Sequence, residues 1–274
     1  MKKTVCIIGG DDRNFELGYL LKKHDIVVKN NINEYKDIDE FLKDADCVVC
    51  GIPFTRDDKT INAVNILEKI NIEEVFKSMK FSKKLIAGSI SNKIKELSNK
   101  YGIELYDFLD DEDFAIYNAI PTAEGAIEVA IRETRSTIHS SNCLILGYGR
   151  IGKVLADMLK GLHANVTVAA RKDIDYAWIK AMGYQYIKYS ELEKILPDVD
   201  ILFNTVPSVV LNKNELSYLK KDSLIVELAS KPGGVDFEAA NELGLKTEVA
   251  LGLPGKVAPK SVAEYMLNKV IKVI

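Results

Sequence analysis

Residues 140–172 constrain the fold of this chain more than any other stretch. An apolar run at 143–146 is followed by Gly-Tyr-Gly-Arg-Ile-Gly at 147–152, by a helical pattern and by a β-branched run at 166–168. A strand, a glycine turn, a helix and a second strand within about thirty residues form the context in which G-x-G-x-x-G binds a dinucleotide. The stretch therefore predicts a dinucleotide-binding domain.

Each glycine of this turn has a physical role. Gly147 permits the tight turn out of the strand, Gly149 lets the backbone approach a pyrophosphate, and Gly152 lets the helix pack close to the sheet. The helix then directs its unpaired N–H groups and positive dipole end at the phosphates. An α/β unit without a ligand and an S-adenosylmethionine site remain as alternatives. The candidate cofactor residues of the turn are Gly147, Tyr148, Gly149, Arg150, Ile151 and Gly152.

The end of the second strand indicates which dinucleotide is bound. A carboxylate for the ribose 2'-hydroxyl is expected about twenty residues after the first glycine. The sequence there is Ala-Ala-Arg-Lys at 169–172, and Asp173 comes one place late. Arg171 and Lys172 would instead suit a 2'-phosphate. We favour NADP over NAD, and the alternative is that both side chains are solvated cations.

Length and composition set the class of protein. A chain of 274 residues, 47% of them hydrophobic, has room for two α/β domains with cores of their own. The net charge of -3 gives no reason to expect nucleic acid or an anionic membrane as a partner. No apolar run is long enough to cross a bilayer, and the N-terminus does not resemble a secretion signal. We expect a cytoplasmic protein.

The four cysteines fit a reducing compartment. Cys47 and Cys50 have the spacing of a metal or redox pair, but they lie in an apolar run that predicts a buried strand. Side chains three residues apart on a strand point to opposite faces, so we favour structural thiols over a zinc site or a disulfide. Cys6 and Cys143 also resemble core residues of strands. No metal site is predicted.

The first part of the chain predicts an α/β domain of its own. Strands are expected at 4–8, 26–28, 47–52, 84–88 and within 101–108, and helices from 13 to about 23 and at 38–43, 73–80 and 92–100. This alternation predicts a parallel sheet with right-handed crossovers. Asp11 and Asp12 follow the first strand and would repel phosphate, so the cofactor is not expected here.

Ligands of such sheets lie beyond the carboxyl ends of the strands. Thr55 and Arg56, in the loop after the third strand, are therefore candidates to bind substrate, although a solvated polar loop is the alternative. Arg13, at the start of the first helix, could face an anionic substrate or be ordinary surface.

The middle of the chain predicts a connection between domains. The acidic run 110–113 is expected to be a solvated connector. Pro121 is expected to block a helix upstream, Thr122 to be an N-cap, and Glu124 to complement the helix dipole. The helix that starts here has an apolar stripe at helical spacing that ends near Ile138. Its apolar residues include Ala123, Ala126, Ile127, Ala130 and Ile131. We expect it to bridge the domains and its N-terminus to bind a substrate carboxylate.

Three more strands are expected at 200–204, 224–228 and 247–251. The first ends in Thr205-Val206-Pro207, where a nicotinamide would lie, and the second leads to Ala229 and Lys231. Pro259 is expected to begin a terminal helix that carries on one face Val262, Tyr265, Met266, Val270 and Val273. The expected domains are 1–121, a bridging helix at 122–139, the Rossmann domain at 140–252 and a returning helix at 253–274. The fold class is α/β, with two doubly wound parallel-sheet domains joined by bridging helices.

Three segments carry a family resemblance over essentially the whole chain. They are Asn-Ala-Ile-Pro-Thr-Ala-Glu-Gly at 118–125, the glycine turn at 147–152, and Leu-Gly-Leu-Pro-Gly-Lys-Val-Ala-Pro-Lys at 251–260. In this order they resemble the A subunit of dipicolinate synthase from spore-forming bacteria. The resemblance implies a cofactor domain like that of D-2-hydroxyacid dehydrogenases beside a smaller α/β domain.

The resemblance also implies an activity. It is the NAD(P)-linked oxidation of a (hydroxy)tetrahydrodipicolinate from the lysine (diaminopimelate) pathway to dipicolinate, in the mother cell of a sporulating bacterium. A flavoprotein-like B subunit is the implied partner, and a homo-oligomer is left open. The protein must hold two carboxylates and orient the ring. Its candidate cations are Arg13, Arg56, Lys231 and Lys256, aided by the helix start at Thr122; Lys256 and Thr122 come first. Glu124 is the candidate general base, unless it is only an exposed capping residue.

Two other functions remain open. A D-2-hydroxyacid dehydrogenase needs a general-base histidine late in the cofactor domain, but the three histidines are His24, His139 and His163. This argues against 2-hydroxyacid oxidation, and His24 and His163 are expected at the surface. The other alternative is a non-catalytic subunit that binds NAD(P) as a scaffold or sensor.

Overall fold

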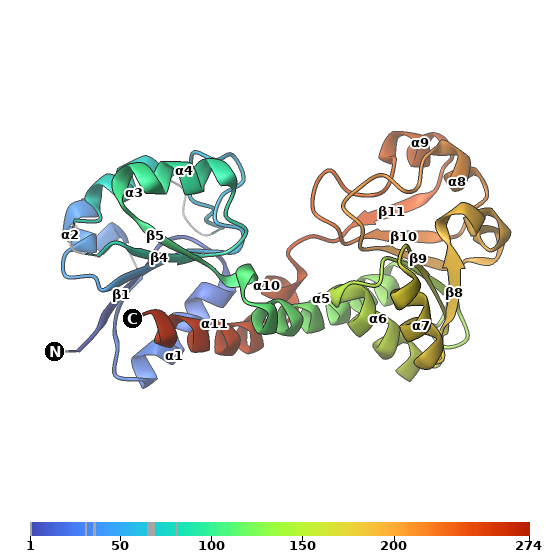
Figure 1. Ribbon diagram of the computed structural model, residues 1–274, viewed down its shortest axis with the longest axis horizontal. Coiled ribbons are helices and arrows are strands. Elements are labelled where there is room, and N and C mark those ends of the chain that lie inside the picture. Colours follow the sequence, from blue (N-terminus) through green and yellow to red (C-terminus); the bar gives the residue numbers. More distant parts are fainter. Residues whose placement is uncertain (1, 31, 35–36, 65–68, 81) are drawn as a thin grey trace. The chain divides into compact units, whose positions relative to one another are not determined.

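The computed structural model describes residues 2–30, 32–34, 37–64, 69–80 and 82–274 (Figure 1). The chain forms two compact units, one made of Met1–Tyr117 with Ala258–Ile274 and the other of Asn118–Val257. Each unit contains one parallel β-sheet, so the prediction of two parallel-sheet α/β domains is confirmed. No helix in the described ranges is both long and apolar enough to cross a bilayer.

In the part of the first unit that the structure describes, five parallel strands lie in the order β2-β1-β3-β4-β5. This is a doubly wound order with its switch point between β1 and β3. The strands are β1 (Thr4–Ile7), β2 (Val27–Lys29), β3 (Cys47–Val49), β4 (Lys84–Ala87) and β5 (Glu104–Asp107). The helices are α1 (Asp12–Lys23), α2 (Ile38–Leu42), α3 (Ile72–Ser78), α4 (Asn92–Tyr101) and α11 (Pro259–Val273), with 3-10 turns η1 (Ile32–Glu34) and η2 (Phe108–Asp110).

Helices cover both faces of this sheet, α3 and α4 on one and α1 and α11 on the other (Figure 1). Cys50 packs into the core on the α3 side and Cys47 into the core on the α1 side, so their predicted opposite orientation is confirmed. All four cysteines are buried free thiols. Burial raises the pKa of Cys6 to about 11 and those of Cys47 and Cys143 to about 12.

The second unit has six parallel strands in the order β11-β10-β9-β6-β7-β8, which is the Rossmann order. They are β6 (Asn142–Leu146), β7 (Asn165–Ala170), β8 (Gln185–Lys188), β9 (Ile201–Asn204), β10 (Leu224–Glu227) and β11 (Lys246–Val249). The helices and 3-10 turns are α5 (Glu112–Glu133), α6 (Arg150–Gly161), α7 (Asp173–Ala181), η3 (Tyr189–Lys194), η4 (Leu196–Asp198), α8 (Lys213–Ser217), α9 (Phe237–Glu242) and α10 (Leu253–Val257). Strand β8 and helices α7, α8, α9 and α10 were not predicted.

Helix α5 corrects the expectation for the middle of the chain. It runs without a break from Glu112 to Glu133 and contains Pro121, so Thr122 is not an N-cap. Thr122 is buried, and its Oγ1 donates to the carbonyl of Asn118 at 2.7 Å. A proline inside a helix removes one backbone hydrogen bond. Burial of the alanine face on both sides of Pro121, which includes Ala119 and Ala126, keeps the segment helical.

The ends of α5 differ from the prediction as well. Glu112 and Asp113 form its first turn, and Asp111 pairs with Lys269 at 2.6 Å, so the acidic run is not a solvated connector. The helix ends at Glu133 rather than near residue 138, and Ile131 is 60% exposed instead of buried. The units divide after residue 117, within α5, rather than after residue 121.

The C-terminal segment packs with the first unit. Pro259 is the first residue of α11, as predicted. The helix buries Val262, Met266 and Val270 in the same core as β1 and α1. Tyr265 is only partly buried, and its ring stacks on that of Tyr117 with centroids 4.3 Å apart.

Candidate functional site

The glycine turn between β6 and α6 is closed by backbone geometry. Gly147 has a φ of +99°, and its N–H donates to the carbonyl of Ala169 at 2.9 Å. A Cβ on Gly152 would lie 2.2 Å from the carbonyl oxygen of Gly147, so only glycine permits this packing of helix on strand. A Cβ on Gly149 would meet no atom of a described residue within 4 Å. The turn is therefore tight on its inner side and open at Gly149.

No side chain among the described residues caps the N-terminus of α6. Gly149 is the N-cap and contributes none, and no acidic residue lies in the first turn. The first N–H groups of a helix need partners from outside it, and with the helix dipole they make an anion site. The turn therefore fits the diphosphate of a dinucleotide. Of the other turn residues, Tyr148 is buried with the ammonium of Lys153 over its ring, Ile151 packs against the core, and Arg150 is exposed.

The first unit has a similar turn whose helix is capped by side chains of the turn itself. Asp11 is the N-cap of α1, accepts from the N–H of Arg13 at 3.1 Å and forms a capping box with Asn14. A Cβ on Gly10 would lie 2.0 Å from Oδ1 of Asn14. The first turn of α1 is thus capped by the Asp11 carboxylate, which would also repel a phosphate.

Beyond the end of β7, the side chain of Arg171 rests on two other segments. Its Nη2 lies 3.2 Å from Oγ of Ser208, and its guanidinium carbon lies 5.8 Å from the ring centroid of Tyr189. The Tyr189 hydroxyl donates to the carbonyl of Ala169 at 3.3 Å, and burial raises the pKa of Tyr189 to about 12. Lys172, the N-cap of α7, is exposed. Arg171 is thus braced beside the glycine turn.

The loops after β9 and β10 lie along the same edge of the sheet. Thr205 packs against the glycine turn. Its Oγ1 donates to the carbonyl of Leu146 at 2.8 Å. A Cβ on Gly147 would lie 2.4 Å from this Oγ1. The candidates that the structure brings to this edge are Thr205, Val206, Pro207 and Ala229. Sequence reasoning missed Glu227 and Asn204, which are buried behind these loops. The signal for them is a polar residue that ends an apolar strand.

The substrate candidates of the first unit differ in availability. Arg13 is buried rather than on the surface, and it pairs with Asp11 at 2.7 Å and donates to the carbonyl of Ile52. The Thr55 hydroxyl organises its own loop by accepting from the N–H of Asp58 at 3.1 Å. Arg56 is exposed, donates through Nε to Oδ1 of Asn62 at 3.0 Å, and has no ion pair with a described residue.

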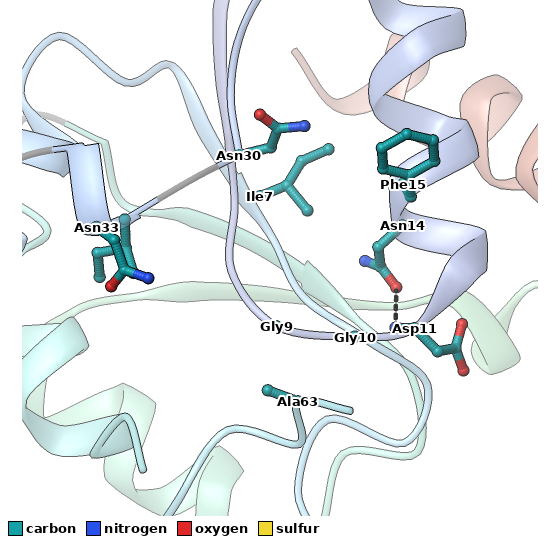
Figure 2. A pocket seen from close by; sticks show the side chains of 10 residues that line it. Ile7, Gly9, Gly10, Asp11, Asn14, Phe15, Asn30, Asn33 and Ala63 are labelled. Atoms are coloured by element: carbon teal, nitrogen blue, oxygen red, sulfur yellow. Dashed lines mark hydrogen bonds between the residues drawn. The ribbon is translucent and has the colours of Figure 1, made fainter. Parts of the chain in front are cut away.

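A pocket of about 220 Å³ lies beside the carboxyl end of β1 (Figure 2). Its lining includes Gly9, Asp11 and Asn14, together with Asn30 and Asn33 (Figure 2). None of Arg13, Thr55 and Arg56 lines it, and the carboxylate of Asp11 is already bound to Arg13. The pocket therefore does not gather the predicted cations.

The candidates of the second unit fall on three segments. Thr122 lies mid-helix, so the expected carboxylate site at a helix N-terminus is wrong there. Glu124 is exposed on α5, and Lys256 is exposed on α10. A Cβ on Gly125 would lie 2.9 Å from Cβ of Leu253, so these two helices pack together. Lys231 is exposed in the loop after β10, and neither lysine forms an ion pair with a described residue.

The histidines lie away from this edge. His139 and His163 precede β6 and β7, at the opposite ends of the strands, with ring centroids 5.6 Å apart. His24 is the C-cap of α1, and both His24 and His163 are exposed as predicted. Among the described residues, no three His, Cys, Asp or Glu side chains are grouped so that they could hold a metal ion.

Comparison with known proteins decides the family. Residues 4–109 match the N-terminal domain of the dipicolinate synthase A subunit, and residues 121–239 match the D-isomer specific 2-hydroxyacid dehydrogenase, NAD binding domain. The chain is 33% identical to the dipicolinate synthase A subunit of Bacillus subtilis (strain 168), over 98% of this chain and 95% of the relative. It belongs to the family of dipicolinate synthase A subunits. With its NAD-binding domain, the chain is an oxidoreductase that uses a nicotinamide nucleotide.

Solved structures agree with this assignment. The dipicolinate synthase A subunits of Bacillus halodurans and Bacillus subtilis superpose with TM-scores of 0.88 and 0.87 at 32% and 31% identity. The matches cover 99% and 100% of this chain, and 97% and 96% of those chains. D-2-hydroxyisocaproate dehydrogenase has a TM-score of 0.66 at 13% identity, over 99% of this chain and 95% of its own, and therefore shares the fold alone.

Proposed function

We propose that this chain is the A subunit of a dipicolinate synthase that oxidises a (hydroxy)tetrahydrodipicolinate to dipicolinate with NADP. The observation that carries the proposal is the open N-terminus of α6 behind Gly149, in a chain 33% identical to the dipicolinate synthase A subunit of Bacillus subtilis over 98% of its length. The bound nicotinamide would supply the chemistry by accepting a hydride from a ring carbon of the substrate. Loss of water and of a proton from the hydroxytetrahydrodipicolinate would complete the aromatic ring.

The residues of the second unit divide the task of holding the cofactor. The turn at 147–152 would hold the diphosphate, with Gly149 leaving room for its approach. Thr205, Val206, Pro207 and Ala229 would lie along the nicotinamide, since they follow β9 and β10 at the same edge. Arg171, braced on Tyr189 and Ser208, would bind the 2'-phosphate with Lys172 beside it.

The substrate carries two carboxylates, so its site needs unpaired cations. Lys231 and Lys256 meet this need best, because both are exposed and neither forms an ion pair with a described residue. Arg56 is a candidate from the first unit, and Thr55 shapes its loop. Arg13 is a weaker candidate because Asp11 already neutralises it.

Glu124 is the candidate general base, since its exposed carboxylate is not used in a cap.

Family membership also suggests the biological setting. We propose that the partner is a B subunit, because the relative is named as the A component of the synthase. We also propose a role in sporulation, within the cytoplasm of the mother cell. The aromatic product makes the oxidation favourable, so the protein need only bind, orient and deprotonate its substrate.

A spectrophotometric assay tests the proposal. The purified chain is mixed with hydroxytetrahydrodipicolinate and NADP, with and without the B subunit, and the absorbance of reduced cofactor is followed. The proposal predicts turnover with dipicolinate as product. Cofactor binding without turnover in either mixture would favour a scaffold, and turnover of simple 2-hydroxyacids would favour a D-2-hydroxyacid dehydrogenase.

A further inference from the structure

Glu227 and Asn204 form a buried polar pair that the proposed chemistry leaves unused. They end the neighbouring strands β10 and β9 and are register partners in the sheet. Glu227 is 2% exposed and Asn204 is fully buried. Nδ2 of Asn204 donates to Oε1 of Glu227 at 2.7 Å. Burying a polar group costs free energy of folding unless the group is hydrogen-bonded. The burial of this pair at the ends of β10 and β9 therefore needs an explanation.

The carboxylate of Glu227 holds both ends of the loop that follows it. Oε1 accepts from the N–H of Ala229 at 2.8 Å, and Oε2 accepts from the N–H of Gly234 at 2.8 Å. Both partners are buried backbone donors, and no basic side chain of a described residue forms an ion pair with Glu227. The segment 229–234 is therefore fastened at both ends to one side chain.

Asn204, which is bonded to Glu227, also bonds to the loop after β9. Its Oδ1 accepts from the N–H of Val206 at 3.1 Å, and its Nδ2 donates to the carbonyl of Val206 at 2.9 Å. A Cβ on Gly234 would lie 2.4 Å from Nδ2 of Asn204. The two loops that border the nicotinamide position are thus packed on one polar pair.

Lys231 lies between the two fastened ends of the loop. Gly233 closes the loop with a φ of +85° and an N–H that donates to the carbonyl of Ser230 at 3.0 Å. Lys231 itself is exposed and has no ion pair with a described residue. A loop held in this way presents an unpaired ammonium from a fixed backbone.

We propose that Glu227 and Asn204 are positioning residues that hold the loop 229–234 so that Lys231 binds a substrate carboxylate. The proposal rests on the proposed function, which assigns Lys231 to the substrate. A carboxylate is required because all three of its partners are N–H donors. Glutamine has one oxygen, so its NH2 group would face a donor and leave one partner unbonded.

Hydrogen exchange tests whether Glu227 holds the loop 229–234, and it does so without an assay of enzyme activity. Deuterium uptake of the peptide that contains 229–234 is compared in wild type and in Glu227→Gln. Glu238→Gln is the matched control, because Glu238 is exposed on α9 and its replacement removes the same charge from the same unit. We expect faster exchange in Glu227→Gln alone. Where that variant does not fold, Glu227→Asp, which retains the charge but shortens the reach, serves for the same comparison.

Kinetics test the link to Lys231. We expect Glu227→Gln to lower kcat/KM for the dicarboxylate substrate by about 10 to 100-fold, chiefly through KM, with Kd for NADP unchanged. The double variant Glu227→Gln with Lys231→Ala should have a kcat/KM within about twofold of that of Lys231→Ala alone, because both changes remove the same interaction with the substrate. The proposal would be overturned if the losses of kcat/KM in the two single variants multiplied in the double variant. It would also be overturned if deuterium uptake of the 229–234 peptide were the same in Glu227→Gln as in wild type. Absence of wild-type turnover would instead contradict the proposed function and the role of Lys231, while the exchange result would still test the attachment.

Discussion

Asp11 and Gly149 are equivalent N-caps, and only Asp11 provides its helix with an acceptor. Asp11 comes directly after the glycines that follow β1, and Gly149 lies within the glycine turn that follows β6. The side chain of Asp11 satisfies α1 and binds Arg13, whereas the cap of α6 is a glycine with open space at its Cβ position. Two similar turns therefore differ in whether a phosphate can approach the helix.

Arg171 is predicted to select NADP. Arg171→Ala should raise Kd for NADP by about 10 to 100-fold, since it removes a charge-assisted contact, and Kd for NAD should change little. Calorimetric titration with 2',5'-ADP and 5'-AMP isolates the 2'-phosphate. Arg135→Ala is the control, because Arg135 is also an exposed arginine of the second unit. Equal losses for both nucleotides would remove the 2'-phosphate assignment.

Thr122 is predicted to have no direct contact with substrate. Its hydroxyl donates to a carbonyl of its own helix, so Thr122→Val should leave substrate KM unchanged. The cost in stability should be about 1 kcal/mol for the lost hydrogen bond. Steady-state kinetics and chemical unfolding measure the two effects. A tenfold rise in KM would restore Thr122 as a ligand-binding residue.

Glu124 is predicted to be the general base. Glu124→Gln should lower kcat by about 100-fold or more, because glutamine cannot take the proton, and should leave Kd for NADP unchanged. Glu264→Gln, an exposed glutamate on α11, is the matched control and should retain full activity. Comparable kcat values for the two variants would exclude Glu124 from proton transfer.

The buried thiols predict a loss of stability in alkali. Their folded pKa values lie above the ordinary value of 9.0, reaching about 11 in Cys6 and about 12 in Cys47 and Cys143, because burial disfavours the thiolate. Their contribution is complete below pH 9 and is lost as pH rises toward the folded values. Each thiol should remove about 1.4 kcal/mol per pH unit in that window.

Unfolding by guanidinium chloride between pH 8 and pH 10.5 measures this dependence. Cys47→Ala should show a shallower decline than wild type, because one of the raised groups is absent. An identical slope in the two proteins would mean that Cys47 does not contribute.

Local patterns predicted most of the strands and the cofactor turn. The unit from β6 to β7 was predictable because its glycines act on neighbours in the sequence, as the contact of Gly152 with Gly147 illustrates. Strand β8 was missed because it is an edge strand in which only Ile187 is buried. Short-range hydrophobic periodicity is weak in such a strand.

Tertiary contacts explain the remaining differences. Pro121 and Thr122 together form a local signal for a helix start, but packing of the alanine face overrides it. The burial of Arg13 depends on Ile52, and the role of Glu227 depends on Asn204, 23 residues away on a neighbouring strand. Such pairs become visible only when the order of the strands is known.

Calorimetric titration of NADP into wild type, Gly149→Ala and Gly161→Ala measures whether the open turn at Gly149 holds the diphosphate of the cofactor. At either glycine a Cβ would meet no atom of the described residues within 4 Å, so both variants should fold. We expect one NADP site per chain. Gly149→Ala should weaken it at least about tenfold, because the methyl group occupies the approach of the diphosphate, and Gly161→Ala should leave it unaffected. Equal affinities for all three proteins, or no binding to wild type, would contradict this expectation.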